Sequence, residues 1–139
     1  MSAEADRLYR LLSGLRDLAT RSLPPETAEV SPALVAILDA LAEGRAQRVS
    51  ELARVLGKSR PTVSVEVKKL ELQGLLRREA DATDRRSKRL VLTPKGRALH
   101  RTIAEARRKT LSKALSALSP EERRTLFLLL EKATKGGSV

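Results

Sequence analysis

Residues 50–74, SELARVLGKSRPTVSVEVKKLELQG, decide the fold of this chain. A short helix is expected to begin at Ser50, because a serine side chain can cap a helix N-terminus, and to end at Gly57. A second helix is expected to begin at Ser59 and to end at Gly74. Two helices joined by a tight turn that contains glycine form a helix-turn-helix, so this stretch predicts one.

The second of these helices has two different faces. Val63, Val67 and Leu70 lie on one side at helical spacing, so this side is expected to pack on the protein. The major groove of double-stranded DNA admits a helix, and the other side can carry hydrogen-bond donors into it. The candidate DNA-binding residues at this helix are Ser59, Arg60, Pro61, Thr62, Ser64, Val65, Lys68 and Lys69.

The residue types on the exposed side suit the edges of base pairs. Arg60 can pair with guanine, and Val65 can contact the methyl group of thymine. The hydroxyl groups of Thr62 and Ser64 can bind bases or phosphates. An ordinary amphipathic helix on the protein surface would show the same two faces, and it is the alternative interpretation.

The positive charge of the chain is concentrated around this helix. The net charge is +11, and the segment from Arg45 to Arg108 has 18 Lys and Arg against 7 Asp and Glu. The remaining residues have 10 of each sign, so the whole excess belongs to one segment. This placement favours a polyanionic partner, whereas the alternative is a solvated basic face without a partner.

After Gly74 the pattern changes from helix to strand. Residues 75–78 and 88–92 predict two short strands around a polar loop, residues 80–87, and such a hairpin is a wing. Arginine suits the narrow minor groove, whose negative potential attracts guanidinium groups. Asp84 is expected to pair with a nearby arginine, because a carboxylate that faced phosphates would be repelled. The predicted wing contacts to DNA are Arg85, Arg86 and Lys88.

Caps and helix breakers predict four further helices, so the expected fold class is mainly α with a small β-hairpin (α+β). Ser119 and Glu122 have the spacing of a capping box at the start of the last helix. Residues 126–130 make this helix apolar most of the way round, which favours a second copy as its cover over burial in its own core. The four helices are expected over residues 2–22, 31–44, 94–118 and 119–135.

The composition argues against several classes of protein. The chain has no cysteine and one histidine, so disulfides and thiolate metal sites are excluded, and no metal or cofactor is expected. A glycine-rich phosphate loop and a nucleophile elbow are both missing from the sequence, which argues against an enzyme. The sequence shows no signal-peptide pattern and no membrane-length apolar run, so a cytoplasmic protein is expected.

Several of these motifs resemble the MarR family of winged helix-turn-helix regulators. The resemblance rests on residues 50–53 (SELA), on residues 61–64 (PTVS) and on the pattern L-E-x-x-G-L at residues 70–75. It rests most on the wing signature D-x-R-x-x-x-x-x-L-T, which is followed by a glycine. The residues of this last motif are Asp84, Arg86, Leu92, Thr93 and Gly96.

The resemblance implies an architecture and a partner. It implies a single domain over residues 1–139, with a DNA-binding winged helix at 31–97 and dimerisation helices at 2–22 and 94–135. The homodimer would place two recognition helices in successive major grooves of a pseudo-palindromic operator, with half-sites roughly 10 bp apart. An architectural protein that binds DNA without sequence preference is the alternative, which the charge alone would permit.

The resemblance also implies a regulatory ligand. Many family members are repressors that small ligands, often aromatic and acidic, release from DNA. The residues to inspect as effector contacts are Tyr9, Arg16 and His100, although each of these types is more often a surface or packing residue.

Overall fold

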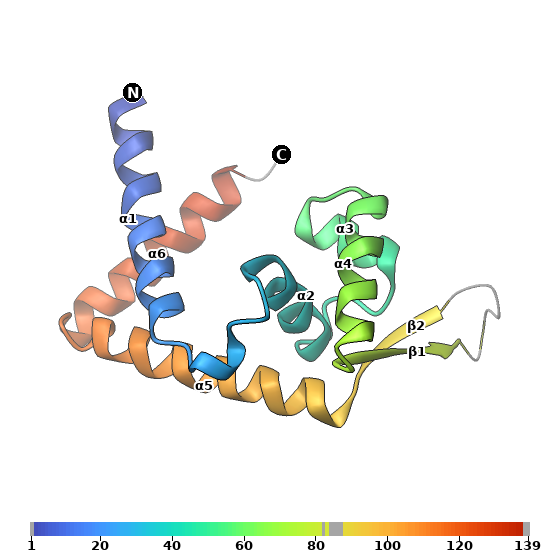
Figure 1. Ribbon diagram of the computed structural model, residues 1–139. Coiled ribbons are helices and arrows are strands. Elements are labelled where there is room, and N and C mark those ends of the chain that lie inside the picture. The colour runs from blue at the N-terminus through green and yellow to red at the C-terminus, as the bar shows by residue number, and fades with distance from the viewer. Residues whose placement is uncertain (1, 82, 84–87, 138–139) are drawn as a thin grey trace. The chain divides into compact units, whose positions relative to one another are not determined.

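The computed structural model describes residues 2–81, 83 and 88–137 (Figure 1). Their fold is mainly helical with one antiparallel hairpin, which confirms the expected fold class. The elements are α1 (Ser2–Arg21), a 3-10 helix η1 (Pro25–Thr27), α2 (Pro32–Ala42), α3 (Val49–Leu56), α4 (Arg60–Leu72), β1 (Leu76–Ala80), β2 (Lys88–Leu92), α5 (Pro94–Leu115) and α6 (Pro120–Gly137).

The chain forms two compact units. Residues 24–104 form one, which we call the winged-helix unit, and residues 1–23 with 105–139 form the other, the helical unit. Helix α5 contributes residues to both. The grouping of all 139 residues into one domain stays a prediction.

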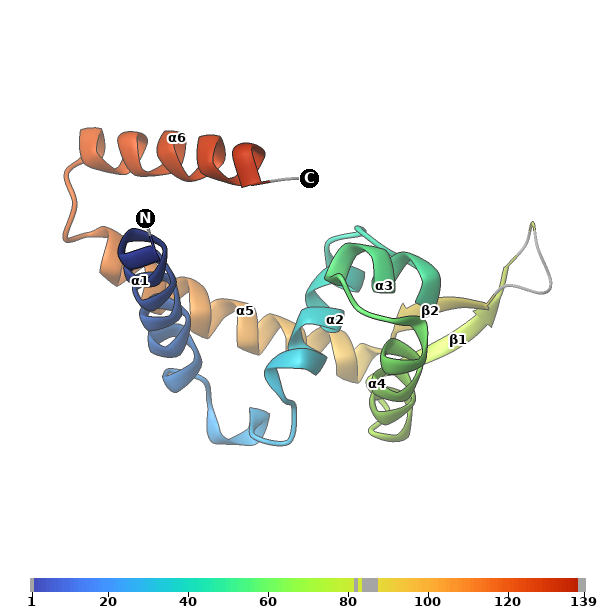
Figure 2. The same cartoon turned by 90° about the horizontal axis from the view of Figure 1, so that it is seen from above.

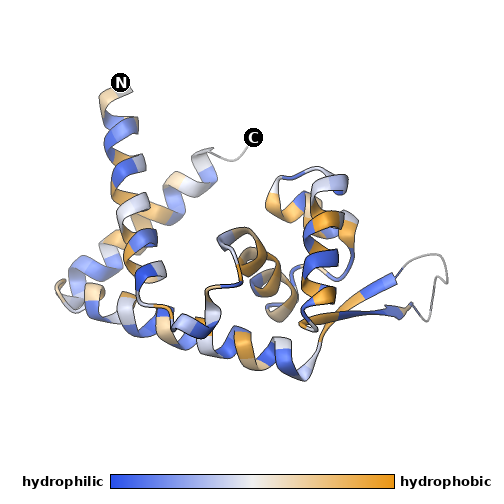
Figure 3. Ribbon diagram, viewed as in Figure 1, coloured by the Kyte–Doolittle hydropathy of each residue, from blue (hydrophilic) through white to orange (hydrophobic). Residues whose placement is uncertain are grey.

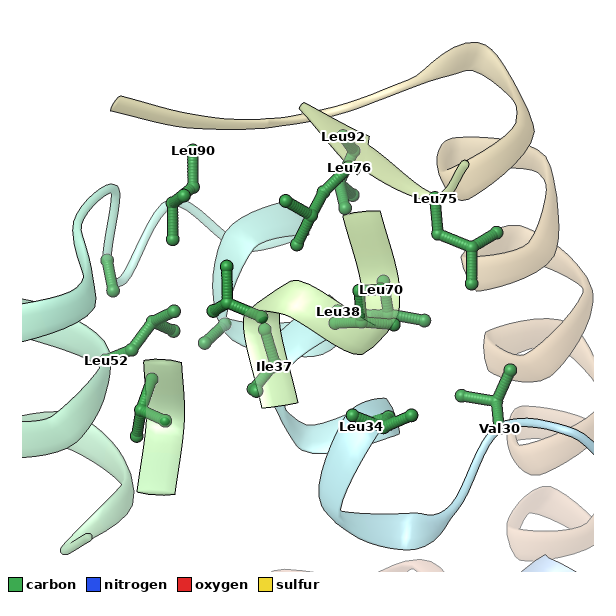
Figure 4. Packing of buried hydrophobic residues seen from close by; sticks show 14 of the residues in the cluster. Val30, Leu34, Ile37, Leu38, Leu52, Leu70, Leu75, Leu76, Leu90 and Leu92 are labelled. Carbon is green, nitrogen blue, oxygen red and sulfur yellow. The ribbon is translucent and has the colours of Figure 1, made fainter. Parts of the chain in front are cut away.

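The core of the winged-helix unit surrounds α2. This helix is hydrophobic over most of its surface (Figure 3), and its Ile37 and Leu38 are completely buried. The predicted inner face of α4 is confirmed, since Val63, Val67 and Leu70 are also completely buried. Figure 4 shows how leucines of α2, α3, α4 and the two strands converge on this core.

The ends of α2 and α4 follow the predicted caps. The Ser31 hydroxyl accepts a hydrogen bond from the amide of Leu34 at 3.3 Å, and Ser59 does the same for Thr62 at 3.3 Å. Gly57 has a φ of 65°, the left-handed conformation that ends α3 and lets the chain turn directly into α4.

The predicted start of α3 at Ser50 is wrong. The N-cap is Arg48, and Ser50 lies within the first turn of the helix. The amide of Gln47, just before the helix, donates to the carboxylate of Glu51 at 3.2 Å. A side chain from the first turn of α3 thus accepts a hydrogen bond from a backbone amide at the N-terminus of the helix. A serine cap is therefore not needed.

The two strands form an antiparallel hairpin that extends outward from α3 and α4 (Figure 2). Leu76 pairs with Leu92, and both side chains are buried together with Leu90. The first strand begins one residue later and ends two residues later than predicted, at Ala80. The amide of Leu90 donates to the carbonyl of Gln47 at 2.7 Å, which attaches the wing to the segment before α3.

The start of α5 is packed against the chain just after α4. The Thr93 hydroxyl accepts from the amide of Gly96 at 3.0 Å and donates to the carbonyl of Gly74 at 2.6 Å. Gly96 is so close to Leu75 that a Cβ atom there would lie 1.9 Å from the Leu75 carbonyl oxygen. Only glycine fits at this position.

The helical unit has a large exposed apolar surface. The capping box of α6 is confirmed, because the Ser119 amide donates to Glu122 at 2.8 Å and the Glu122 amide to the Ser119 hydroxyl at 3.1 Å. The hydrogen bond from the Ser119 amide, followed by one from the Ser119 side chain, lowers the pKa of Glu122. In α6, all of whose residues are described, no side chain is buried, so this helix is not folded into a core of its own.

None of the described helices has both the length and the apolar character needed to cross a membrane.

Candidate nucleic-acid interface

Helix α4 gathers the predicted DNA-binding residues on its exposed side. All eight, from Ser59 to Lys69, are exposed, and Val65 is 57% exposed although it is apolar. Ser59 caps the helix and donates from its hydroxyl to Thr62 Oγ1 at 2.8 Å. The Thr62 hydroxyl therefore keeps its own proton for another acceptor. The exposed side offers cations, hydroxyls and one methyl-bearing side chain, which is the mixture that base edges and phosphates need.

An ion pair that the sequence analysis missed fixes α4 to the turn before it. Lys58 Nζ lies 3.1 Å and 3.2 Å from the two carboxylate oxygens of Glu66. Glu66 is only 8% exposed and lies on the same side of α4 as the apolar stripe. The sequence feature that could have indicated this ion pair is the position of the charged Glu66 within the apolar stripe of α4. The pair holds the helix-turn-helix turn in place.

The strands of the wing neutralise part of their own charge. Glu79 accepts from Arg77 at 2.8 Å and from Arg89 at 3.3 Å. The hydrogen bond from Arg77, followed by that from Arg89, lowers the pKa of Glu79. Lys88 is exposed at the start of β2. Of the other predicted wing residues, Asp84, Arg85 and Arg86 lie outside the described part of the chain.

A second missed ion pair connects the base of the wing to α3. Arg48 pairs with Asp81, whose Oδ1 also accepts from the amide and hydroxyl of Thr83 at 2.9 Å and 2.8 Å. Asp81 thus has the structural role that was expected for a wing carboxylate. The spacing between Asp81 and Thr83 is typical of an Asx turn. The ion pair with Arg48 joins residues that are 33 positions apart, so no local sequence pattern indicates it.

The three effector candidates have different surroundings. Tyr9 is 69% exposed on α1, and Arg16 is exposed on the same helix. His100 on α5 lies in the winged-helix unit, where its Nε2 is 2.8 Å from Asp39 Oδ1 on α2. Both members of this pair are largely buried, so His100 joins α5 to α2. In the described residues, no group of three His, Cys, Asp or Glu could hold a metal ion.

Comparison with known proteins shows which family the chain resembles. Residues 30–87, which run from the start of α2 into the wing, match the sequence model of the MarR family. The helix-turn-helix and the first part of the wing are thus similar to those of the MarR family. A MarR family protein from Bacillus stearothermophilus is 25% identical, with a TM-score of 0.80 over 97% of this chain and 94% of that one. The MarR fold therefore extends over the helices outside the matched residues.

Two further solved structures have the same fold. A probable transcriptional regulator from Pseudomonas aeruginosa is 27% identical over 93% of this chain and 95% of that one, with a TM-score of 0.74. Bordetella bronchiseptica BpsR, whose DNA binding is regulated by 6-hydroxynicotinic acid, is 23% identical over 95% of this chain and 98% of that one, with a TM-score of 0.76. The proteins that this chain resembles are transcriptional regulators, and their family is not one of enzymes.

Proposed function

We propose that this protein is a homodimeric repressor of the MarR type that recognises a specific sequence in double-stranded DNA. The observation that carries the proposal is the exposed side of α4, opposite a completely buried apolar stripe. A helix anchored in this way can enter the major groove without losing its packing on the protein. Arg60, Thr62, Ser64 and Val65 would read bases, and Lys68 and Lys69 would bind phosphates.

The wing supplies a second contact. Arg85, Arg86 and Lys88 would follow the minor groove or its phosphates beside the groove that α4 enters. Lys88 is exposed, and the ion pair between Arg48 and Asp81 connects the base of the wing to the start of α3. This arrangement assigns general affinity to the wing and sequence preference to α4.

The helical unit supplies the dimer. Helix α1 exposes five leucines between Leu8 and Leu18, each at least 40% exposed, and α6 exposes four large apolar side chains from Phe127 to Leu130. Apolar surfaces of this extent are usually covered by a partner. A second copy of the chain would bury them and place two α4 helices on the half-sites of a pseudo-palindromic operator.

Release by a small aromatic or acidic effector completes the proposed function. The DNA binding of BpsR, which has the same fold, is regulated by 6-hydroxynicotinic acid. Tyr9 and Arg16 in the helical unit, and separately His100 in the winged-helix unit, are the residues that we propose as candidate contacts for such a ligand. An acidic ligand at His100 would compete with Asp39 for the imidazole. A regulator of this kind acts on the chromosome, so we place it in the cytoplasm.

Replacing Ser64 by alanine is expected to change the base preference at one position in each half-site. The hydroxyl is lost, but no charge is lost, so the dependence of binding on salt should stay that of the wild type. Discrimination at that position should fall by about 1–3 kcal/mol, measured by competition between duplexes that differ at single base pairs.

The contrasting variant is Lys88→Ala in the wing. It should weaken binding to every duplex by the same factor and reduce the salt dependence, because a phosphate contact is lost. If Ser64→Ala also weakened all duplexes equally and left the preference unchanged, α4 would not be the reading helix.

A further inference from the structure

A basic hollow lies between α3 and the start of α4. Its volume is about 390 Å³, and it opens on the surface of the helix-turn-helix. Three of the residues that line it are cations and one is a carboxylate. The lining residues are Ser50, Glu51, Ala53, Arg54, Lys58 and Arg60.

Two of the charges in this hollow are already engaged within the protein. Glu51 accepts from the amide of Gln47 at 3.2 Å and lies 3.5 Å from Arg48, so its negative charge is partly compensated. Lys58 is held by Glu66 at 3.1 Å. The carboxylate therefore does not cancel the positive charge at the mouth of the hollow.

The other two cations have no such partner among the residues that the structure describes. Arg54 and Arg60 are exposed, and neither has a hydrogen bond or ion pair to any described side chain. Arg54 comes from the last turn of α3 and Arg60 from the first residue of α4, so the turn between the helices brings them to one hollow. Two unpaired guanidinium groups beside the Ser50 hydroxyl suit a tetrahedral oxyanion, because a guanidinium group can bind phosphate through two parallel hydrogen bonds.

We infer that this hollow binds a phosphate of the DNA backbone, with Arg54 as its principal ligand. The inference rests on the proposed function and adds a contact to it. In a helix-turn-helix the first helix crosses the backbone while the second enters the major groove. Arg54 on α3 is therefore placed for a phosphate, and Arg60 can bind the same group or the adjacent base. The contact fixes the register of α4 and carries no sequence information of its own.

The test measures binding to one operator duplex and to one random duplex over a series of salt concentrations, in a phosphate-free buffer. Arg54→Ala should weaken binding to both duplexes by the same factor, about tenfold, and should lower the slope of log K against log salt by about 0.9. Arg54→Lys should keep the wild-type slope but lose part of the affinity, since ammonium cannot bind phosphate bidentately.

The matched control is Arg101→Ala, which removes one exposed arginine of α5 that does not line the hollow. Its slope should equal that of the wild type. An unchanged slope for Arg54→Ala, in a wild-type protein that binds the operator, would overturn this inference and leave the proposed function standing. A wild-type protein that does not bind DNA would overturn both.

A free phosphate ion could bind the same two guanidinium groups. A further experiment therefore distinguishes the free ion from a phosphate of the DNA backbone. Inorganic phosphate is added at constant ionic strength. If it weakens DNA binding of the wild type but not of Arg54→Ala, the free ion and the DNA backbone compete for the hollow, which supports the backbone contact. If calorimetry shows that inorganic phosphate binds the wild type but not Arg54→Ala, and the ion leaves DNA binding of the wild type unchanged, the hollow is a site for the free ion only and the backbone contact is overturned.

Discussion

Replacing Gly96 by alanine is expected to lower the free energy of unfolding of the winged-helix unit by about 3 kcal/mol or more. The new Cβ atom would lie 1.9 Å from the Leu75 carbonyl oxygen and 2.9 Å from its carbon. Leu75 cannot easily move, because its carbonyl accepts from Thr93 at 3.1 Å and its amide donates to Leu70 at 2.9 Å. The start of α5 must then separate from the end of α4.

Thermal unfolding measures this effect. For a unit of this size the melting temperature should fall by more than about 12 °C. The control is Gly136→Ala near the end of α6, where a Cβ atom would meet nothing within 4 Å. That variant should be as stable as the wild type or slightly more stable, since alanine favours helix. Equal melting temperatures for the two variants would contradict the close approach at Gly96.

The double change Leu128→Glu and Leu129→Glu is expected to abolish the homodimer. These side chains are 67% and 60% exposed, so the folded chain alone tolerates glutamate there, whereas a dimer interface would bury the new charges. The sedimenting mass should fall from that of two chains to 15.3 kDa. Affinity for a palindromic operator should fall by about 100-fold or more, because the two half-sites are no longer bound together.

The matched control for this change is Leu72→Glu. Leu72 is 80% exposed, but it lies on α4 in the winged-helix unit. Its replacement should leave the mass of the dimer unchanged. A wild-type mass near 15.3 kDa at micromolar concentration would refute the proposed assembly.

The parts of the fold that depend on neighbouring residues could be predicted from the sequence. The buried stripe of α4 and the caps at Ser31 and Ser59 depend on residues within a few positions of each other, and the structure has all of them. The capping box at Ser119 is of the same kind. The start of α3 could not be predicted from a cap residue, because the helix begins at Val49 and its N-cap is Arg48.

The ion pairs around the site could not be predicted in the same way. Arg48 and Asp81 come together only because β2 pairs with the segment before α3, and His100 reaches Asp39 only because α5 packs on α2. Such contacts join residues that are tens of positions apart, so no local pattern signals them. The hollow at Arg54 also depends on how the turn places α3 against α4.

The roles of single residues at the DNA remain predictions. The structure places the α4 residues together on an exposed surface, but it does not describe Arg85 and Arg86. Sequence preference itself depends on the base pairs that face α4, which neither the sequence nor the fold of the protein contains.

Selection of bound fragments from a pool of random duplex DNA by the wild-type protein tests the central claim most directly. The proposed function predicts an enriched inverted repeat, with half-sites roughly 10 bp apart and a preference over random DNA on the order of a thousandfold. A pool that is retained without enrichment of any sequence would instead indicate an architectural protein, and would contradict sequence-specific regulation by this chain.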